Sequence, residues 1–579
     1  MPPHGSGTAA LFAAPKPTPT PTPDPVESGL VDYVLNNGDK LMWFAITLTL
    51  IVGVAAFLAQ RQIERRWNGS GMATRRQLRR SMTRAAIYKE AKATTPSLQV
   101  PRRLRRKIPL GQYAIYLGKA SEFYLMPLYA AYRDIILLIG PPQTGKTALL
   151  GHWLIDVPGC MVTTSTKVDA YLQTREQRAK SGNVYLFNPK GLGGLLSDFR
   201  WNPIDGCQDP NVATERAAAM LHAAGQAEDV ENAGFWTDLA TDLLKCYMHA
   251  AALDNRSFRE MWQWTQNPDN EMPLLILRGN KMAADGWDDA AEAILSMHER
   301  TVKSVLVTLR RALRFMTNES AAASVAPEPG MPAFDIDAFL TSSDALYLIG
   351  ENEQSGSIAP LFACFTTALF SRAKELASFR AYGRHDPAVS FILDEAALIC
   401  PIPLADWAAD SGGRGIFVAM AVQSMAQIDQ IYGAKRARAL RDAANTLIVL
   451  PGLKDTSFTE EVSKLCGEHD VKVHGAENRD ASGQTSSRST SIRRERVMPV
   501  EKIREMRTNQ ALILRRNTRP VLVDYKPVWK RKELRAATTA YQAAAAAGFD
   551  PGEFQAPAPR KAGQQLVAVD ADEWDRTDG

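Results

Sequence analysis

The sequence has few of the residues that build metal sites and covalent frameworks. Its 579 residues include only six cysteines and eight histidines. The cysteines, at positions 160, 207, 246, 364, 400 and 466, form no CxxC pair and no cluster with histidine. This spacing excludes a zinc site of the usual pattern and a disulfide framework, so the thiols are expected to be reduced in a cytosolic body.

Long uncharged runs are also scarce, and residues 41–59 are the exception, with nineteen consecutive positions free of charge. As an α-helix this run spans the hydrocarbon layer of a bilayer, which is about 30 Å thick. Residues 61–107 carry fifteen Lys or Arg against two Glu, whereas residues 1–40 hold four acids and two lysines. The positive-inside rule therefore predicts a single-pass protein of the inner or plasma membrane, with the N-terminus outside and the body in the cytoplasm.

The segments around this run have distinct compositions. Residues 1–40 contain eight prolines, which predicts an extended, disordered arm. Residues 60–110 are interpreted as a basic cytoplasmic segment lying on anionic lipid, with a direct nucleic-acid role as the secondary alternative. A buried helix of a soluble domain is the alternative for residues 41–59.

A glycine-rich loop lies in DIILLIGPPQTGKTALL, residues 134–150, and has the spacing GxxxxGK[ST]. The preceding apolar run predicts a buried strand over 135–139, and a helix is expected over 148–155. In such a loop the backbone N–H groups converge on an anion at the positive end of a helix. A lysine then contacts the β and γ phosphates of ATP, and a hydroxyl ligates Mg²⁺. The predicted nucleotide-binding residues are Gly140, Pro141, Pro142, Gln143, Thr144, Gly145, Lys146, Thr147 and Ala148.

A second chemical signal is VSFILDE, residues 389–395, in which a hydrophobic run ends in two carboxylates. Asp394 is predicted to hold Mg²⁺ together with Thr147, and Glu395 to orient or deprotonate the attacking water. Gln423 ends another apolar run, where its amide is placed to contact the γ-phosphate. An ordinary strand ending in a helix cap is the alternative for VSFILDE, and a polar cap is the alternative for Gln423.

Apolar runs alternate with helical stretches from residue 111 onward, which indicates an α/β fold with a parallel sheet. The further predicted strands are residues 160–164, 184–187, 345–349, 390–393, 416–422 and 446–450.

Several motifs occur together in this order: the P-loop, STKVD at 165–169, WNPID at 201–205, FWTDLATDLL at 235–244, FILDEA at 391–396 and GRGIFVAMAVQSMAQIDQIYG at 413–433. The set resembles the conjugative coupling proteins of type IV secretion systems, the TraG/TraD group, which are related to the FtsK and HerA motors. Two features depart from that group. Its members commonly have two membrane helices where one is found here, and Asn188 stands where an aspartate is usual.

The resemblance implies a RecA-like P-loop NTPase domain over residues 111–206 and 331–530, with an inserted all-α domain over 207–330. It also implies a membrane-anchored homo-hexamer that uses ATP and Mg²⁺, receives a relaxase bound to single-stranded DNA and delivers it to a type IV secretion channel. Tryptophans 236, 262, 264 and 287 of the insertion are interpreted mainly as core residues, with base stacking as the alternative.

Ring motors of this kind complete each site with an arginine from the neighbouring subunit. Arg414, on the glycine-flanked loop SGGRG, is the first candidate and Arg441 the second. The alternative is that Arg414 pairs with a nearby surface acid.

The remaining polar segments are expected to be irregular. Residues 467–495 are interpreted as an exposed, mobile loop. Residues 531–579 are predicted to form a largely disordered tail that is acidic at its end.

Two other functions stay open at this stage. The first is an FtsK-like double-stranded DNA translocase, against which stands the lack of a winged-helix-like module after the ATPase. The second is a nucleotide-binding substrate receptor without motor activity, against which stands the complete set Lys146, Thr147, Asp394 and Glu395.

Overall fold

The computed structural model describes residues 42–43, 46–52, 70–98, 100–105, 107–123, 126–225, 233–326, 332–351, 357–479 and 485–547. Two compact units divide the chain, residues 1–66 and 67–579. In the first unit the described residues are helical, and large apolar side chains such as Trp43 and Leu50 are exposed. Most of the predicted membrane helix, and the whole predicted arm, lie outside the described residues. Within the described ranges, no helix is both long and apolar enough to cross a membrane.

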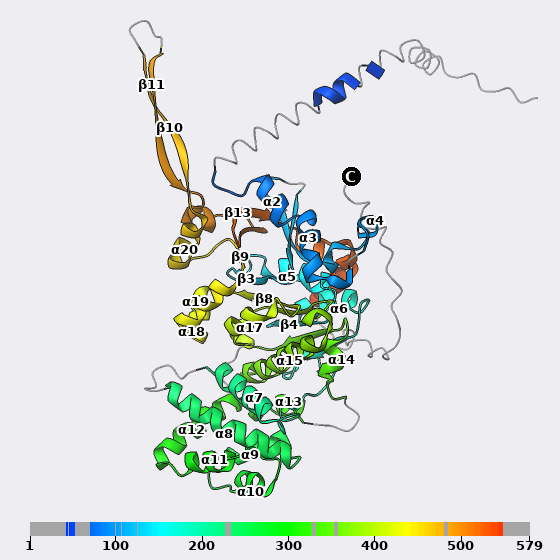
Figure 1. The fold of residues 1–579 in the computed structure, drawn as a ribbon, viewed down its shortest axis with the longest axis vertical. Coiled ribbons are helices and arrows are strands. Elements are labelled where there is room, and N and C mark those ends of the chain that lie inside the picture. Colours follow the sequence, from blue (N-terminus) through cyan, green and yellow to red (C-terminus); the bar gives the residue numbers. More distant parts are fainter. Residues whose placement is uncertain are drawn as a thin grey trace, which may run out of the picture. The chain divides into compact units, whose positions relative to one another are not determined.

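Eleven strands of the second unit form one mixed sheet, in the order β2-β1-β13-β12-β9-β3-β8-β7-β4-β6-β5. Figure 1 labels β13, β9, β3, β8 and β4 of this sheet. The seven strands from β9 to β5 are parallel to one another. The bounds of these strands are β3 Ile135–Ile139, β4 Met161–Ser165, β5 Val184–Phe187, β6 Ala345–Ile349, β7 Val389–Leu393, β8 Ile416–Val422 and β9 Thr446–Val449. All seven agree with the predicted strands to within one residue at each end.

The parallel strands form where the sequence has uninterrupted aliphatic runs. Every residue of β3, β7 and β8 is buried, because helices cover both faces of this part of the sheet. Sequence reasoning did not predict the four antiparallel strands that extend the sheet beyond β9, which are β1 Ala114–Ala120, β2 Pro127–Ala131, β12 Gln510–Arg515 and β13 Thr518–Asp524.

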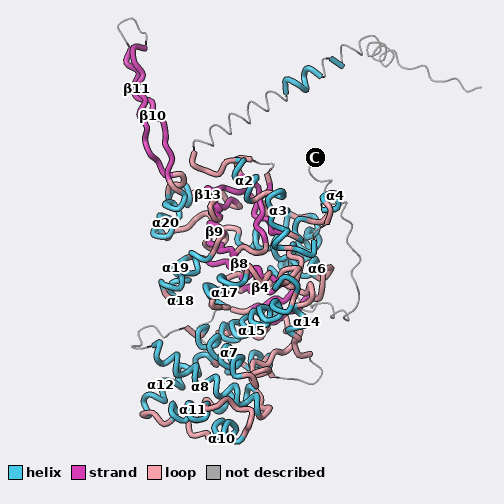
Figure 2. Tube along the Cα trace, in the orientation of Figure 1, coloured by secondary structure: helices cyan, strands magenta, loops and turns pink. Residues whose placement is uncertain are grey.

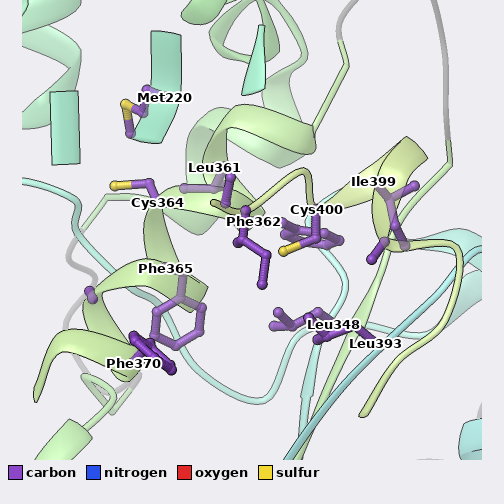
Figure 3. Close-up of a cluster of buried hydrophobic side chains, with 14 of the residues drawn as sticks. Met220, Leu348, Leu361, Phe362, Cys364, Phe365, Phe370, Leu393, Ile399 and Cys400 are labelled. Carbon is purple, nitrogen blue, oxygen red and sulfur yellow. The ribbon is translucent and has the colours of Figure 1, made fainter. Parts of the chain in front are cut away.

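Most helices beside the sheet follow a strand directly. Their bounds are α5 Lys146–Asp156, α6 Asp169–Arg178, α15 Ala359–Phe379, α16 Ala396–Ile399, α17 Leu404–Ser411, α18 Met425–Tyr432, α19 Ala434–Ala443, α20 Thr456–Cys466 and α21 Val500–Arg504. Helix α15 contributes Phe362, Phe365 and Phe370 to the large core cluster, together with Leu348 of β6 and Leu393 of β7 (Figure 3).

Helices make up the segment that follows β5. Their bounds are α7 Pro210–Ala223, α8 Ala233–Leu253, α9 Phe258–Trp264, α10 Met272–Gly279, α11 Trp287–Leu295, α12 Glu299–Ala312 and α13 Glu319–Ser324, and α14 Ile336–Leu340 then leads into β6. Helix α7 packs against α15, so Met220 and Cys364 belong to one continuous core. Trp264 is buried, and Trp236, Trp262 and Trp287 are partly buried against this core.

The predicted basic segment 60–110 contains helices α2 Arg75–Ser81, α3 Arg84–Thr94 and α4 Arg102–Arg105. Leu78 and Ile87 are buried, and α3 packs against β2. This part of the segment therefore belongs to the folded body. At the other end, the predicted disordered tail begins with helix α22, Arg535–Ala547, which packs against α6. Residues 548–579 of the tail lie outside the described residues.

The prediction of a mobile loop over 467–495 is wrong. Strands β10 Glu468–Arg479 and β11 Thr485–Arg496 form a long antiparallel hairpin that extends from α20 (Figure 2). Its register places Glu468 opposite Arg496 and Asp470 opposite Arg494. Opposite charges across two strands stabilise a hairpin that has little apolar surface to bury.

Candidate nucleotide-binding site

The register of the parallel strands brings three predicted site segments to one edge of the sheet. Ile139 of β3 pairs with Val422 of β8, and Leu393 of β7 pairs with Met420 of β8. The residues that follow these strands, including Gly140 and Gln423, therefore lie together at the carboxyl ends of the strands. This edge is where open α/β sheets bind their ligands.

The loop between β3 and α5 needs its glycines because the backbone lies close to neighbouring groups. A Cβ on Gly140 would lie 2.6 Å from the Leu450 Cβ, and one on Gly145 would lie 2.7 Å from the Tyr525 hydroxyl. Gly145 has a φ of 101°, and Gln143 also adopts a left-handed conformation with a φ of 64°. The Thr144 hydroxyl donates to the Pro141 carbonyl at 2.7 Å and so ties the loop across itself.

Lys146 is the first residue of α5 and links the loop to the acidic strand end. Its side chain is 7% exposed, and its Nζ donates to the Gly140 carbonyl at 2.8 Å. The same ammonium lies 3.5 Å from the Glu395 Oε1, while the Glu395 Oε2 accepts a hydrogen bond from the Gln423 Nε2 at 2.9 Å. Lysine, glutamate and glutamine thus form a continuous polar chain across the ends of β3, β7 and β8. Glu395 has a φ of 51°, a conformation unfavourable for a residue with a side chain and one that is often found at functional sites.

Asp394 ends β7 beside this chain. Burial, and then the neighbouring Glu395 carboxylate, raise the pKa of Asp394 to about 7. Its Oδ1 accepts from the Glu395 backbone N–H at 3.1 Å, and its carbonyl accepts from the Thr164 hydroxyl at 2.7 Å. The carboxylate is therefore held in place beside groups that raise its affinity for a proton or another cation.

The chemistry of these donors fits Mg²⁺ bound together with phosphate. No cluster of three or more His, Cys, Asp or Glu side chains suited to a metal occurs among the described residues. Mg²⁺ in nucleotide sites takes only one or two protein ligands, and phosphates and water supply the others. Asp394 and the exposed Thr147, whose side chain carries a hydroxyl, would be the protein ligands of Mg²⁺.

The structure does not bring the two candidate arginines to this cluster. Arg414 precedes β8 and therefore lies at the opposite, amino-terminal edge of the sheet. Its Nε donates to Asp410 at 2.8 Å, and its NH1 donates to the Ser378 hydroxyl at 2.9 Å. Arg441 pairs with Glu461 at 2.6 Å. Within this chain, Arg414 thus makes the surface acid pairing that was its alternative interpretation.

Asn188 organises its own loop after β5. Its side-chain Nδ2 donates to the carbonyls of Leu192 and Leu195 at 2.9 Å and 2.8 Å, and its Oδ1 accepts from the Leu192 N–H at 3.0 Å. The amide at this strand end therefore satisfies loop backbone groups within the chain.

Sequence reasoning missed three residues that lie beside the P-loop. The Tyr525 hydroxyl, at the end of β13, lies 3.3 Å from the Gly145 carbonyl, and a Cβ on Gly145 would lie 3.2 Å from the Asn509 Oδ1. A Cβ on Gly452, after β9, would lie 3.6 Å from the Pro141 side chain and 3.7 Å from the Thr144 side chain. None of the three belongs to a recognisable motif, and only the antiparallel pairing of β12 and β13 brings Asn509 and Tyr525 close.

Taken together, a central parallel sheet, a P-loop after β3 and two carboxylates after β7 define a P-loop nucleoside-triphosphatase fold with a helical insertion. The comparisons with known proteins narrow this class. Residues 388–508 match the family model described as the TraM recognition site of TraD and TraG. The matched stretch contains Asp394, Glu395, Gln423 and the β10–β11 hairpin.

Relatives with a similar sequence are named as a secretion system-coupling protein and a conjugal transfer protein. The chain is 28% identical over 160 residues to the type IV secretion system-coupling protein VirD4 of Bartonella quintana, which covers 27% of this chain and 25% of that protein. It is 28% identical over 147 residues to the conjugal transfer protein TraG of Agrobacterium fabrum. This matched stretch covers 25% of this chain and 22% of that protein. The chain thus matches about a quarter of the length of these relatives.

Two solved structures of the plasmid coupling protein TrwB show the same fold. The unbound form has a TM-score of 0.51 at 20% identity, covering 68% of this chain and 85% of that chain. The complex with ADP and Mg²⁺ has a TM-score of 0.50 at 20% identity, covering 68% and 86%. The resemblance to the coupling proteins of type IV secretion systems, predicted from the motifs, is confirmed.

Proposed function

We propose that this chain is a membrane-anchored coupling protein that hydrolyses ATP while it recruits a relaxase with single-stranded DNA and delivers it to a type IV secretion channel. The observation that carries the proposal is the Lys146–Glu395–Gln423 chain at the carboxyl edge of the sheet, with Asp394 beside it. The similarity to VirD4 and TraG supports the secretion pathway, and the complex of TrwB with ADP and Mg²⁺ supports the choice of cofactor.

Each residue has a defined role in this proposal. The P-loop N–H groups and Lys146 hold the β and γ phosphates, and Thr147 with Asp394 holds Mg²⁺, which neutralises phosphate charge when bound. Glu395 accepts a proton from the attacking water, because its carboxylate is fixed between Lys146 and Gln423. Gln423 reports the state of the γ-phosphate to β8. Arg414 acts in the site of the next subunit in a homo-hexameric ring.

Partner recognition is proposed for the region around residues 388–508. The matched family model is described as a recognition site for TraM, and the β10–β11 hairpin lies in this stretch. We propose that an accessory protein of the DNA-processing complex docks here. A pull-down with the chain lacking residues 470–494 tests this, since loss of the accessory protein alone, with ATP binding intact, is the expected result.

The membrane topology is also a proposal. Residues 41–59 would span the inner or plasma membrane once, with the N-terminus outside and the ATPase body in the cytoplasm. Protease added outside intact cells should then remove only the arm before Lys40. Cleavage of the ATPase body from that side would contradict this topology.

The test of the motor is a plasmid-transfer assay combined with ATP hydrolysis by the purified chain. Lys146→Ala should abolish ATP binding or turnover and also plasmid transfer, because the buried phosphates lose their counter-charge. If transfer persists without turnover, the chain is a substrate receptor and not a motor. Stimulation of hydrolysis by double-stranded but not single-stranded DNA would favour the FtsK-like alternative.

The trans action of Arg414 has its own experiment. Arg414→Ala and Lys146→Ala subunits are each inactive in this proposal, but mixed rings contain some interfaces with both residues intact. Mixing should therefore restore part of the ATPase activity. Normal hydrolysis by Arg414→Ala rings in the presence of DNA would exclude the role of this arginine.

A further inference from the structure

Two exposed aromatic side chains mark the amino-terminal edge of the sheet. Phe379 and Tyr382 are each 81% exposed, more than any other large apolar side chain in the described part of the chain. Phe379 is the last residue of α15, whose first twelve residues, 359–370, are all buried. Tyr382 lies three residues further on, in the short turn that leads to β7. Neither ring contributes to the core of this subunit.

The turn that presents Tyr382 has an unfavourable backbone. Tyr382 has a φ of 63°, and Gly383 follows with a φ of 64°. A bulky residue in the left-handed region is uncommon, and such conformations are concentrated at ligand clamps and functional contacts. An exposed tyrosine in this conformation gains nothing from packing within the subunit.

Arg414 lies on this surface. Its NH1 donates to the hydroxyl of Ser378, the residue before Phe379, and to the Lys374 carbonyl at 3.3 Å. Asp410 accepts from both Arg414 and Lys374, at 2.8 Å and 3.3 Å. The guanidinium is thus fixed against the last turn of α15, the helix that ends at Phe379. Together, Lys374, Phe379, Tyr382, Asp410 and Arg414 form a surface called here the aromatic edge.

The nucleotide-binding edge would require a second cation besides Lys146. The ammonium of Lys146 is the cation bonded to Glu395, and the two candidate arginines Arg414 and Arg441 are bonded elsewhere in the subunit. Charge that develops on the γ-phosphate needs a further cation. Arg414 cannot supply it within its own subunit, because it lies at the other edge of the sheet. A head-to-tail contact between two copies would join these edges.

We propose that Phe379 and Tyr382 are the apolar anchors that seat the aromatic edge of one copy against the nucleotide-binding edge of the next. This inference rests on the proposed ring-forming function and names the contact that positions Arg414. Aromatic side chains that become buried at the centre of an interface contribute most of its binding free energy. Lys374, Asp410 and Arg414 supply the polar rim.

A second copy fits this surface better than a lipid bilayer. The charged groups beside the rings have both signs, namely Lys374 and Arg414 against Asp410 and the exposed Glu375. Apolar centres with mixed polar rims are typical of protein interfaces. Surfaces that bind anionic lipid instead carry an excess of Lys and Arg.

The first experiment measures assembly of the full 579-residue chain against protein concentration, with ATP and Mg²⁺, by analytical ultracentrifugation. The double variant Phe379→Ser with Tyr382→Asn should need at least about tenfold more protein for half-assembly, since both anchors are lost. Asparagine tolerates the left-handed conformation, so the turn is kept. Phe235→Ser removes a 52% exposed phenylalanine of α8 and is the matched control, expected to assemble like the parent.

ATP binding and turnover separate the inference from the proposed function. Binding of ADP by the double variant should stay within about twofold of the parent, because the P-loop lies at the other edge, and its ATPase activity should recover at high protein concentration. Arg414→Ala should assemble normally but stay inactive at every concentration. If the parent assembles and the double variant assembles equally well, this inference is wrong and the proposed function is unaffected. If the parent stays monomeric with ATP, Mg²⁺ and DNA, both proposals fail.

The second experiment identifies the occupant directly. A photo-crosslinking benzoylphenylalanine replaces Phe379, and the adducts are mapped by mass spectrometry. Adducts between two copies, at residues that follow β3, β7 or β8, are expected. Adducts only with lipid, or only with a different protein, would overturn the proposal.

Discussion

The charged residues at the two ends of β3 differ in how firmly they are paired. At its carboxyl end, Lys146 and Glu395 are 3.5 Å apart with side chains 7% and 12% exposed, and Gln143 and Glu395 have unfavourable backbone angles. At its amino end, Asp134 is fully buried and bonded to Arg515 at 2.7 Å and also to Arg516. The first arrangement leaves the charged groups able to exchange partners with a ligand. The second joins β3 to the turn between β12 and β13.

This contrast predicts that variants at the carboxyl end change chemistry, whereas variants at the amino end change stability. The largest effect is expected for Glu395→Gln. An amide still orients water but cannot accept its proton, so hydrolysis should fall by about 10²- to 10⁴-fold while ATP binding is kept. Single-turnover hydrolysis and nucleotide titration measure the two quantities. Hydrolysis at the parental rate would mean that Glu395 is structural.

Asp134→Ala should act on stability alone. It leaves two arginines without their buried partner, which costs about 3–5 kcal/mol in the free energy of unfolding. Denaturant unfolding measures the loss, and nucleotide affinity of the remaining folded protein should be unchanged. Asp337→Ala is the control, because its partner Arg372 is on the surface and the pair is 53% and 34% exposed. That change should cost at most about 1 kcal/mol. Equal losses of unfolding free energy in the two variants would contradict the structural role assigned to the buried Asp134.

A smaller effect is expected for Gln423→Ala, which removes the hydrogen bond at 2.9 Å to Glu395. A hydrogen bond to a charged group contributes about 1.5–3 kcal/mol, so turnover should fall roughly 10- to 150-fold through loss of the orientation of Glu395. Gln423→Glu is a useful companion, because it places a second carboxylate against Glu395 and should reduce turnover further. A change in unfolding free energy without a change in turnover would assign Gln423 a purely structural role.

The smallest effect is expected in the hairpin, where the paired charged side chains are exposed to solvent. Arg494 and Asp470 lie 3.6 Å apart, and their side chains are 76% and 65% exposed. Arg494→Ala should raise amide exchange near the hairpin base and cost about 0.2–1 kcal/mol locally. Exchanging the two residues should restore protection. A loss of protection in β3 or β8 would show that the hairpin is coupled to the core more strongly than its contacts indicate.

Much of the nucleotide site could be predicted because its signals are local. An aliphatic strand, a glycine loop and a lysine follow one another within residues 134–150, and two acids directly end β7. The strand periodicity then implies that their ends meet at one edge. Tyr525 and Asn509 could not be predicted in this way, because their contact with Gly145 depends on the pairing of β12 and β13 almost 400 residues further along the chain.

The β10–β11 hairpin was not predicted, for a different physical reason. Its second strand contains TSSRSTS, residues 485–491, which lacks the apolar alternation that identifies a half-buried strand. Its stabilising pairs, such as Glu468 with Arg496, join residues that are far apart in sequence. The position of Arg414, by contrast, could be read from the predicted strand over 416–422, because a residue that precedes a parallel strand lies at the amino-terminal edge of the sheet.

The length of the β10–β11 hairpin gives it a mechanical property. Twelve residues per strand at about 3.4 Å each make a lever arm of roughly 40 Å. Its base follows α20, and the chain between β9 and α20 passes Gly452, where an added Cβ would lie 3.6 Å from Pro141 and 3.7 Å from Thr144 of the P-loop. By this geometry a tilt of about 5° at the base would displace the tip by roughly 3–4 Å. A small rotation at the base of the hairpin would thus become, at the far end of its strands, a displacement of about one residue's rise along a strand.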